Sequence, residues 1–144
     1  YLKIFEVFEV LASGKSNVLN TEIYITENKI YYKLKKVLDN GKEIWRSLYG
    51  EGYSVVPRPL YALGLVYVCS GFGTASLYAI DPTGKGDVTS SHVRWEIGKR
   101  IPRESTPIIV GDHVYVNDDK GIVSCLEATS GQRVWQKRID GGGG

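Results

Sequence analysis

The chain has 144 residues, of which 42% are hydrophobic and 24% charged, so it can bury a core and is not disordered by composition. Its 18 basic and 16 acidic residues are spread along the chain, and the small net charge of +2 argues against a nucleic-acid-binding surface. The abundance of Gly (17) and Tyr (10), together with many β-branched residues, favours strands and tight turns.

Residues 1–20 are predicted to lie outside the repeat that fills the rest of the chain. A helix here would place four apolar side chains on one face: Tyr1, Ile4, Phe8 and Leu11. The Ile, Val and Phe content of the same residues is equally compatible with a strand, and a β-sheet protein needs edge strands. We therefore expect an N-terminal strand or edge segment.

From residue 21 onward the sequence repeats itself. Residues 59–68 align with residues 107–116 and bring a Val-Tyr-Val triplet to the same place in both. A Gly and then a Trp close each unit, and Ile23-Tyr24-Ile25 begins a weaker first copy. The predicted structural positions of the repeat are Tyr24, Tyr67 and Tyr115, Gly41, Gly84 and Gly131, and Trp45, Trp95 and Trp135.

Each unit is predicted to hold four short antiparallel strands separated by turns. A four-stranded unit of about 40 residues has the size of one β-propeller blade. The predicted fold is therefore all-β, with about three propeller-type blades that form a partial β-propeller. The predicted blades span residues 21–50, 51–100 and 101–140. The second of them contains an insertion near residues 85–91, and residues 141–144 are expected to form a flexible Gly tail.

The repeated Trp is predicted to fill the gap between neighbouring sheets, and the Gly before it to supply the turn. On this reasoning Trp135→Ala should cost about 3–5 kcal/mol of stability. Four residues are expected to point inward, toward a neighbouring blade: Val66, Val68, Val114 and Val116.

The last unit resembles the PQQ-enzyme-like repeat of quinoprotein-like proteins. Its segments Gly111-Asp112-His113-Val114-Tyr115-Val116, Gly121-Ile122-Val123-Ser124-Cys125-Leu126-Glu127-Ala128 and Gly131-Gln132-Arg133-Val134-Trp135 carry the likeness. The stretch from Gly52 to Gly142 is similar to propeller proteins of planctomycete-type bacteria.

The resemblance implies a propeller scaffold and says little about chemistry. Members of the family include dehydrogenases that bind the quinone cofactor PQQ, and also an outer-membrane assembly lipoprotein that binds none. The dehydrogenases use an adjacent Cys-Cys disulfide, calcium ligands and a catalytic Asp, and no such motif aligns with this chain. We therefore expect no catalytic, cofactor-binding or metal-binding residue here. PQQ is expected only in a complete parent propeller.

Other candidate groups have structural explanations. Cys69 and Cys125 could form one disulfide, although two buried free thiols are the simpler interpretation. Residues 81–87 resemble a calcium loop, but Lys85 stands at a ligand position and His92 replaces the final Glu. His92 and His113 have no partner motif, so a surface or structural role is expected.

We expect a non-catalytic scaffold or interaction module within a larger protein. The alternative is a part of a PQQ-dependent or other extracytoplasmic enzyme whose active site lies in other blades. Propeller faces are built from loops, which commonly carry binding residues. Candidate contact residues are Arg58, Tyr61, Arg94, Arg100 and Arg103.

The expected partner is a protein or further propeller blades, including a homodimer whose two copies close a ring of about six blades. No nucleic acid and no membrane span are expected. The sequence begins at Tyr1 without a Met or a visible signal peptide, so we expect an excerpt or a processed product. The family resemblance implies a periplasmic or cell-surface location for the parent protein.

Overall fold

The computed structural model of the chain describes the backbone of residues 3–10, 16–25, 30–38, 43–53 and 56–139. Side chains are described for residues 43–49, 56–71 and 73–139. The described residues contain strands and turns but no helix, and therefore no helix that could cross a membrane. The strands are β1 (Lys3–Val10), β2 (Ser16–Ile25), β3 (Ile30–Leu38), β4 (Glu43–Tyr53), β5 (Leu60–Ala62), β6 (Leu65–Cys69), β7 (Phe72–Gly73), β8 (Leu77–Ile80), β9 (Gly86–Asp87), β10 (Val93–Ile97), β11 (Ile108–Val110), β12 (His113–Asn117), β13 (Ile122–Glu127) and β14 (Arg133–Arg138).

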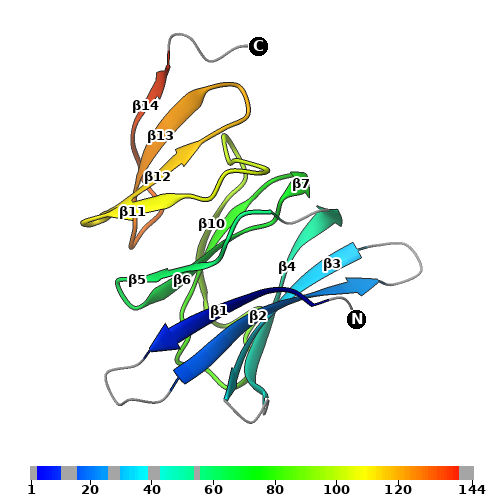
Figure 1. Cartoon of the computed structure of the whole chain (residues 1–144). Coiled ribbons are helices and arrows are strands. Elements are labelled where there is room, and N and C mark those ends of the chain that lie inside the picture. Colours follow the sequence, from blue (N-terminus) through cyan, green and yellow to red (C-terminus); the bar gives the residue numbers. More distant parts are fainter. Residues whose placement is uncertain (1–2, 11–15, 26–29, 39–42, 54–55, 140–144) are drawn as a thin grey trace.

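The strands form three sheets that follow one another along the chain (Figure 1). In the first sheet the order is β1-β2-β3-β4, extended by the short strands β7 and β9. The second has the order β10-β8-β6-β5 and the third β11-β12-β13-β14, with antiparallel neighbours throughout. This arrangement confirms the all-β prediction of four-stranded blades in a partial β-propeller.

The N-terminal residues are part of the first sheet. Residues 3–10 form the edge strand β1 rather than a helix, and they pair with β2 along its length. The predicted boundary between residues 20 and 21 therefore falls inside β2. The register of β2, β3 and β4 places Leu19, and not Tyr24, in the row of Trp45. The long β2–β3 hairpin explains the difference, because equal Tyr-to-Gly spacing does not mark equal positions when strand lengths differ.

The second and third sheets repeat the same row of residues across their four strands. Pairing places Leu60, Tyr67, Ala79 and Trp95 in one row of the second sheet. The equivalent row of the third sheet is Ile108, Tyr115, Cys125 and Trp135. Since side chains alternate along a strand, each row lies on one face of its sheet.

The first and second sheets are joined by the side chain of Trp45. Trp45 is fully buried with Val66, Val68 and Ile80 of the second sheet. Its indole Nε1 donates a hydrogen bond of 2.9 Å to the carbonyl oxygen of Pro82. The ring thus fills the space between the sheets, and its polar atom is satisfied there.

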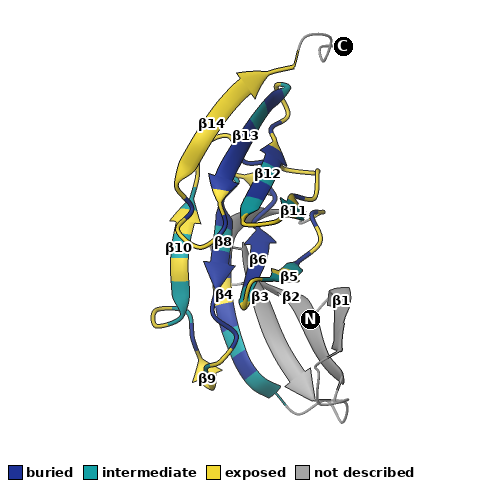
Figure 2. Cartoon of the chain, turned by 90° about the vertical axis from the view of Figure 1, so that its left-hand side faces the viewer, coloured by how far each residue is buried: buried dark blue, intermediate teal, exposed yellow. Residues whose placement is uncertain are grey.

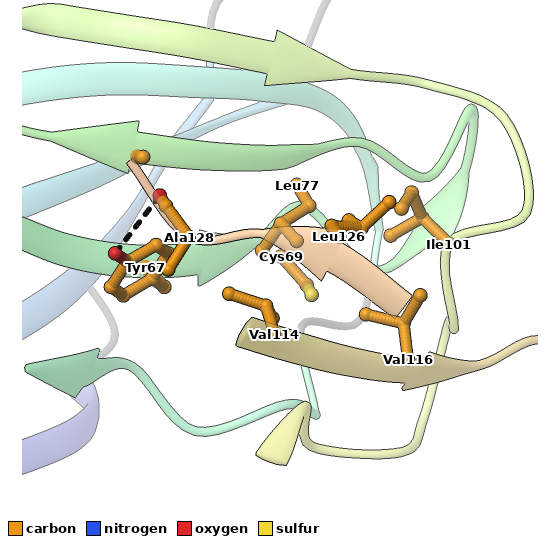
Figure 3. Packing of buried hydrophobic residues seen from close by; sticks show 9 residues of the cluster. Tyr67, Cys69, Leu77, Ile101, Val114, Val116, Leu126 and Ala128 are labelled. Carbon is orange, nitrogen blue, oxygen red and sulfur yellow. Dashed lines mark hydrogen bonds between the residues drawn. The ribbon is translucent and has the colours of Figure 1, made fainter. Parts of the chain in front are cut away.

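The second and third sheets are joined in the same way by Trp95. Its indole Nε1 donates to the carbonyl oxygen of Ala128 at 3.0 Å, and the hydroxyl of Tyr67 donates to the same oxygen at 3.1 Å (Figure 3). Gly131 lies against the Trp95 ring, where an added Cβ would come within 2.7 Å of a ring carbon. Gly131 also has a φ of +73°, so both space and backbone conformation require glycine.

The four valines expected to point inward are buried at these two contacts. Val66 and Val68 pack in the cluster of Trp45, and Val114 and Val116 pack in the cluster of Tyr67. In Figure 3, Val114 of the third sheet lies near Cys69 of the second, and Val116 lies nearer to Leu126 and Ile101.

The insertion near residues 85–91 strengthens the first contact. Its strand β9 runs parallel to β4, and the backbone N–H of Val88 donates to the carbonyl of Arg46. The hydroxyl of Thr89 accepts a hydrogen bond from the backbone N–H of Leu48. The side chain of Val88 is buried with Trp45, so the insertion ties the second blade to the first sheet.

Among the residues that the structure describes, no further sheet covers the third Trp. Trp135 is 45% exposed, whereas Trp45 is fully buried, and the whole of β14 is exposed (Figure 2). The expectation that Trp135→Ala costs about 3–5 kcal/mol is therefore wrong for this chain, because that cost applies to a buried ring. The sequence repeat identified the equivalent position but not whether a neighbour occupies it.

We expect Trp45→Ala to lower the free energy of unfolding by about 3–5 kcal/mol, because it empties a large buried site and leaves the Pro82 carbonyl without its donor. Trp135→Ala is the matched control and should cost about 1 kcal/mol or less at a concentration where the chain is monomeric. Urea unfolding followed by far-UV circular dichroism measures both. Equal losses for the two variants would contradict the packing described here.

Candidate functional site

An open cleft of about 690 Å³ lies where loops of the second and third sheets meet. The β6–β8 connection, the β10–β11 connection and the β12–β13 turn all lie at the same end of the stacked sheets, since neighbouring strands are antiparallel. The residues that line the cleft are Gly73, Thr74, Ala75, Gly98, Lys99, Arg100, Ile101, Arg103, Asp118, Asp119, Lys120, Arg133 and Gln136.

The β12–β13 turn is built around the carboxylate of Asp118. Its Oδ1 accepts hydrogen bonds from the backbone N–H groups of Lys120 and Ile122, both at 2.9 Å. Burial opposes ionisation of this carboxyl, but these two hydrogen bonds and the nearby Arg100 outweigh it and hold the pKa of Asp118 below its usual value. Asp118 is therefore an ionised turn former at neutral pH.

Two arginines of the β10–β11 connection form ion pairs with this turn. Arg100 reaches Oδ2 of Asp118 with an N–O distance of 3.2 Å. The Nε of Arg103 lies 3.5 Å from Oδ2 of Asp119, and its backbone N–H donates to Oδ1 of Asp119. Arg100 holds a left-handed φ of +63°, which is uncommon for a residue with a side chain.

The cleft retains a positive charge after these pairs have formed. It contains five basic and two acidic residues, and both carboxylates face arginines within the cleft. Lys99, Lys120 and Arg133 form no ion pair among the described residues. The guanidinium of Arg133 donates to the carbonyl of Lys99 at 3.0 Å, and Arg138 donates to the carbonyl of Lys120 at 3.2 Å. These two hydrogen bonds connect the loops that carry Lys99 and Lys120 to strand β14.

Only two of the five predicted contact residues lie in this cleft, namely Arg100 and Arg103. Arg94 instead forms an ion pair with Asp81, and Arg58 and Tyr61 are exposed elsewhere. Sequence reasoning missed Lys99, Lys120 and Arg133. The run from Gly98 to Arg103 holds three basic residues and was an available signal, but nothing in the sequence connects it to β14.

The calcium-like loop is a structural turn. Oδ1 of Asp81 accepts hydrogen bonds from the backbone N–H and the hydroxyl of Thr83, and Oδ2 pairs with Arg94. The hydrogen bonds from Thr83, followed by Arg94, lower the pKa of Asp81 to about 2. Its carboxylate oxygens are thus used within the chain.

The two histidines lie apart and face different partners. The His92 ring meets the Ser91 hydroxyl at 2.7 Å and packs near Gly84, where an added Cβ would clash with it. The His113 ring lies 6.4 Å from that of Tyr115. Gly41 lies outside the described residues, and only the backbone of Tyr24 is described.

Among the described residues, no group of three His, Cys, Asp or Glu side chains is arranged to hold a metal. Cys69 and Cys125 are both buried free thiols on different sheets, and burial raises the pKa of Cys69 to about 12. A thiol of this kind is unreactive at neutral pH.

Comparisons with known proteins agree with the sheet architecture. The family described as outer membrane protein assembly factor BamB matches residues 22–143. No curated protein matches the chain. A solved europium-containing methanol dehydrogenase superimposes with a TM-score of 0.55 at 16% identity, over 81% of this chain and 24% of that one. BamB from Moraxella catarrhalis superimposes with a TM-score of 0.56 at 13% identity, over 96% of this chain and 51% of that one.

The two solved chains share the fold at low sequence identity, and this chain spans about a quarter and about half of their lengths. The family match extends over most of the chain, from the middle of β2 to beyond β14. Together with the three successive β-sheets, it establishes that the chain belongs to the BamB-like, PQQ-type β-propeller family.

Proposed function

We propose that the chain is a non-catalytic scaffold module of a larger propeller protein and that its loop end binds a protein partner. The observation that carries the proposal is the basic cleft. It combines loops from two blades, and its walls are fixed by the Arg100–Asp118 and Arg103–Asp119 pairs. Loops held by a rigid scaffold are the usual place for binding residues.

The family supports a scaffold role outside the cytoplasm. The matching family is described as an outer membrane protein assembly factor, which names an assembly role for its members. For the parent of this chain we propose a periplasmic or cell-surface location on that basis. The likeness to planctomycete-type members stays a prediction.

A part of an enzyme is the second candidate, and it is favoured by the similarity to the methanol dehydrogenase. In that case the active site would be formed by blades outside these residues. For this chain alone we propose that no quinone binds, because the described residues supply neither a metal-ligand group nor adjacent cysteines. A quinone spectrum that shifted on titration with the chain would favour the enzyme.

A photo-crosslinking residue tests the scaffold role in the cells that make the protein. Placed at Gln136, at the cleft, it should give one discrete protein adduct after irradiation, because the partner contacts this end. The matched control places it at the exposed Lys85, beyond the opposite end of β8, and should give none. No adduct at either position, or the same adducts at both, would contradict the proposal.

We also propose that the isolated chain associates through its uncovered third sheet. Ile108, Trp135 and Ile139 are 63%, 45% and 53% exposed on this sheet or at its end, where a following blade would lie. Two copies supply six blade-type sheets, a number that can close into a ring with two-fold symmetry. Light scattering at micromolar concentration should therefore give twice the chain mass, and Trp135→Glu should reduce it. A monomer that persists at every concentration would refute the dimer.

A further inference from the structure

We propose that the basic cleft binds an extended acidic segment of a protein partner, whose carboxylates contact Lys99, Lys120 and Arg133. This inference rests on the proposed protein-binding function and specifies the chemistry of the partner. The three cations line one cleft and come from the β10–β11 connection, the β12–β13 turn and strand β14.

The charge balance of the cleft favours an anion. Asp118 and Asp119 are the only acidic residues among the described residues of its lining, and each already faces an arginine. Lys99, Lys120 and Arg133 have no carboxylate partner among the described residues. Like charges gathered in a cleft repel one another, and an incoming carboxylate relieves this repulsion.

The cleft is also arranged before any ligand arrives. Arg133 holds the carbonyl of Lys99, and Arg138 holds that of Lys120, so β14 positions both lysine-bearing loops. Arg100 has a left-handed backbone conformation, and its side chain forms the ion pair with Asp118. Sparsely populated backbone conformations persist where the surroundings enforce them, and they concentrate at functional sites. A fixed site loses less entropy on binding than a mobile one.

The lining favours a peptide over a nucleic acid. Its described residues include no aromatic side chain on which a base could stack, and three unpaired cations are few for a phosphate backbone. The side chains of Thr74 and Gln136 offer neutral hydrogen-bonding groups between the charges. Alternating carboxylates and hydrogen-bonding groups are what an extended acidic segment supplies.

Titration of the ¹⁵N-labelled full chain with an eight-residue peptide of alternating Glu and Ser tests the inference. Saturable shifts are expected at the amides of Gly73, Thr74, Gly98 and Lys99. In the variant K120E/R133E the affinity should fall at least tenfold. In K85E/K137E, which carries the same charge change at two positions outside the cleft lining, it should stay within twofold. A peptide with Gln in place of Glu should not bind.

Three results would overturn the inference: equal loss in both charge variants, shifts spread evenly over the surface, or tighter binding of an eight-nucleotide oligothymidylate than of the peptide. Should K120E/R133E lose its circular dichroism spectrum, the neutral variant K99Q/K120Q/R133Q takes its place. A photo-crosslinked adduct at Gln136 that survives in the variant would leave the protein-binding function standing and remove only the acidic partner.

Discussion

The rest of the structure depends on one contact, in which a tryptophan of one sheet packs on the next sheet and its indole N–H donates a hydrogen bond to a main-chain carbonyl there. It occurs twice, from Trp45 to Pro82 and from Trp95 to Ala128. Each time the ring removes a large apolar surface from water while its one polar group finds an acceptor in the following sheet. Because the acceptor sits in a turn before a strand, the contact fixes both the spacing of the sheets and their relative position along the strands.

The site follows from this stacking. Docking of Trp95 against Gly131 brings the start of β14 to the second sheet, and with it Arg133 to the carbonyl of Lys99. The basic cleft is therefore a consequence of how two blades pack, and neither blade would form it alone. The same contact also explains the open end, where the Tyr115 and Trp135 rings lie 6.1 Å apart and face no further sheet.

The repeat allowed much of the fold to be predicted, because its marker residues are the ones that make contacts between blades. Trp45, Trp95 and Gly131 could be identified from spacing alone. The exposure of Trp135 could not, since it depends on whether a neighbouring sheet is present. The hairpin of the first blade is longer than those of the later blades, so the spacing from Tyr24 did not identify the residue equivalent to Tyr67 and Tyr115. The cleft itself was not predicted, and only Arg100 and Arg103 of its lining were among the candidate contact residues, since the cations that complete it are distant in sequence and meet through tertiary packing.

The docking contact is tested most directly by measuring, by NMR, how fast the indole N–H protons exchange with solvent. The chain has three tryptophans, so three indole resonances are followed. In a monomeric sample the protons of Trp45 and Trp95 should exchange at least tenfold more slowly than that of Trp135, because the first two are hydrogen-bonded between sheets and the third lies on a half-exposed ring. Equal exchange rates for all three protons in that sample would contradict the account.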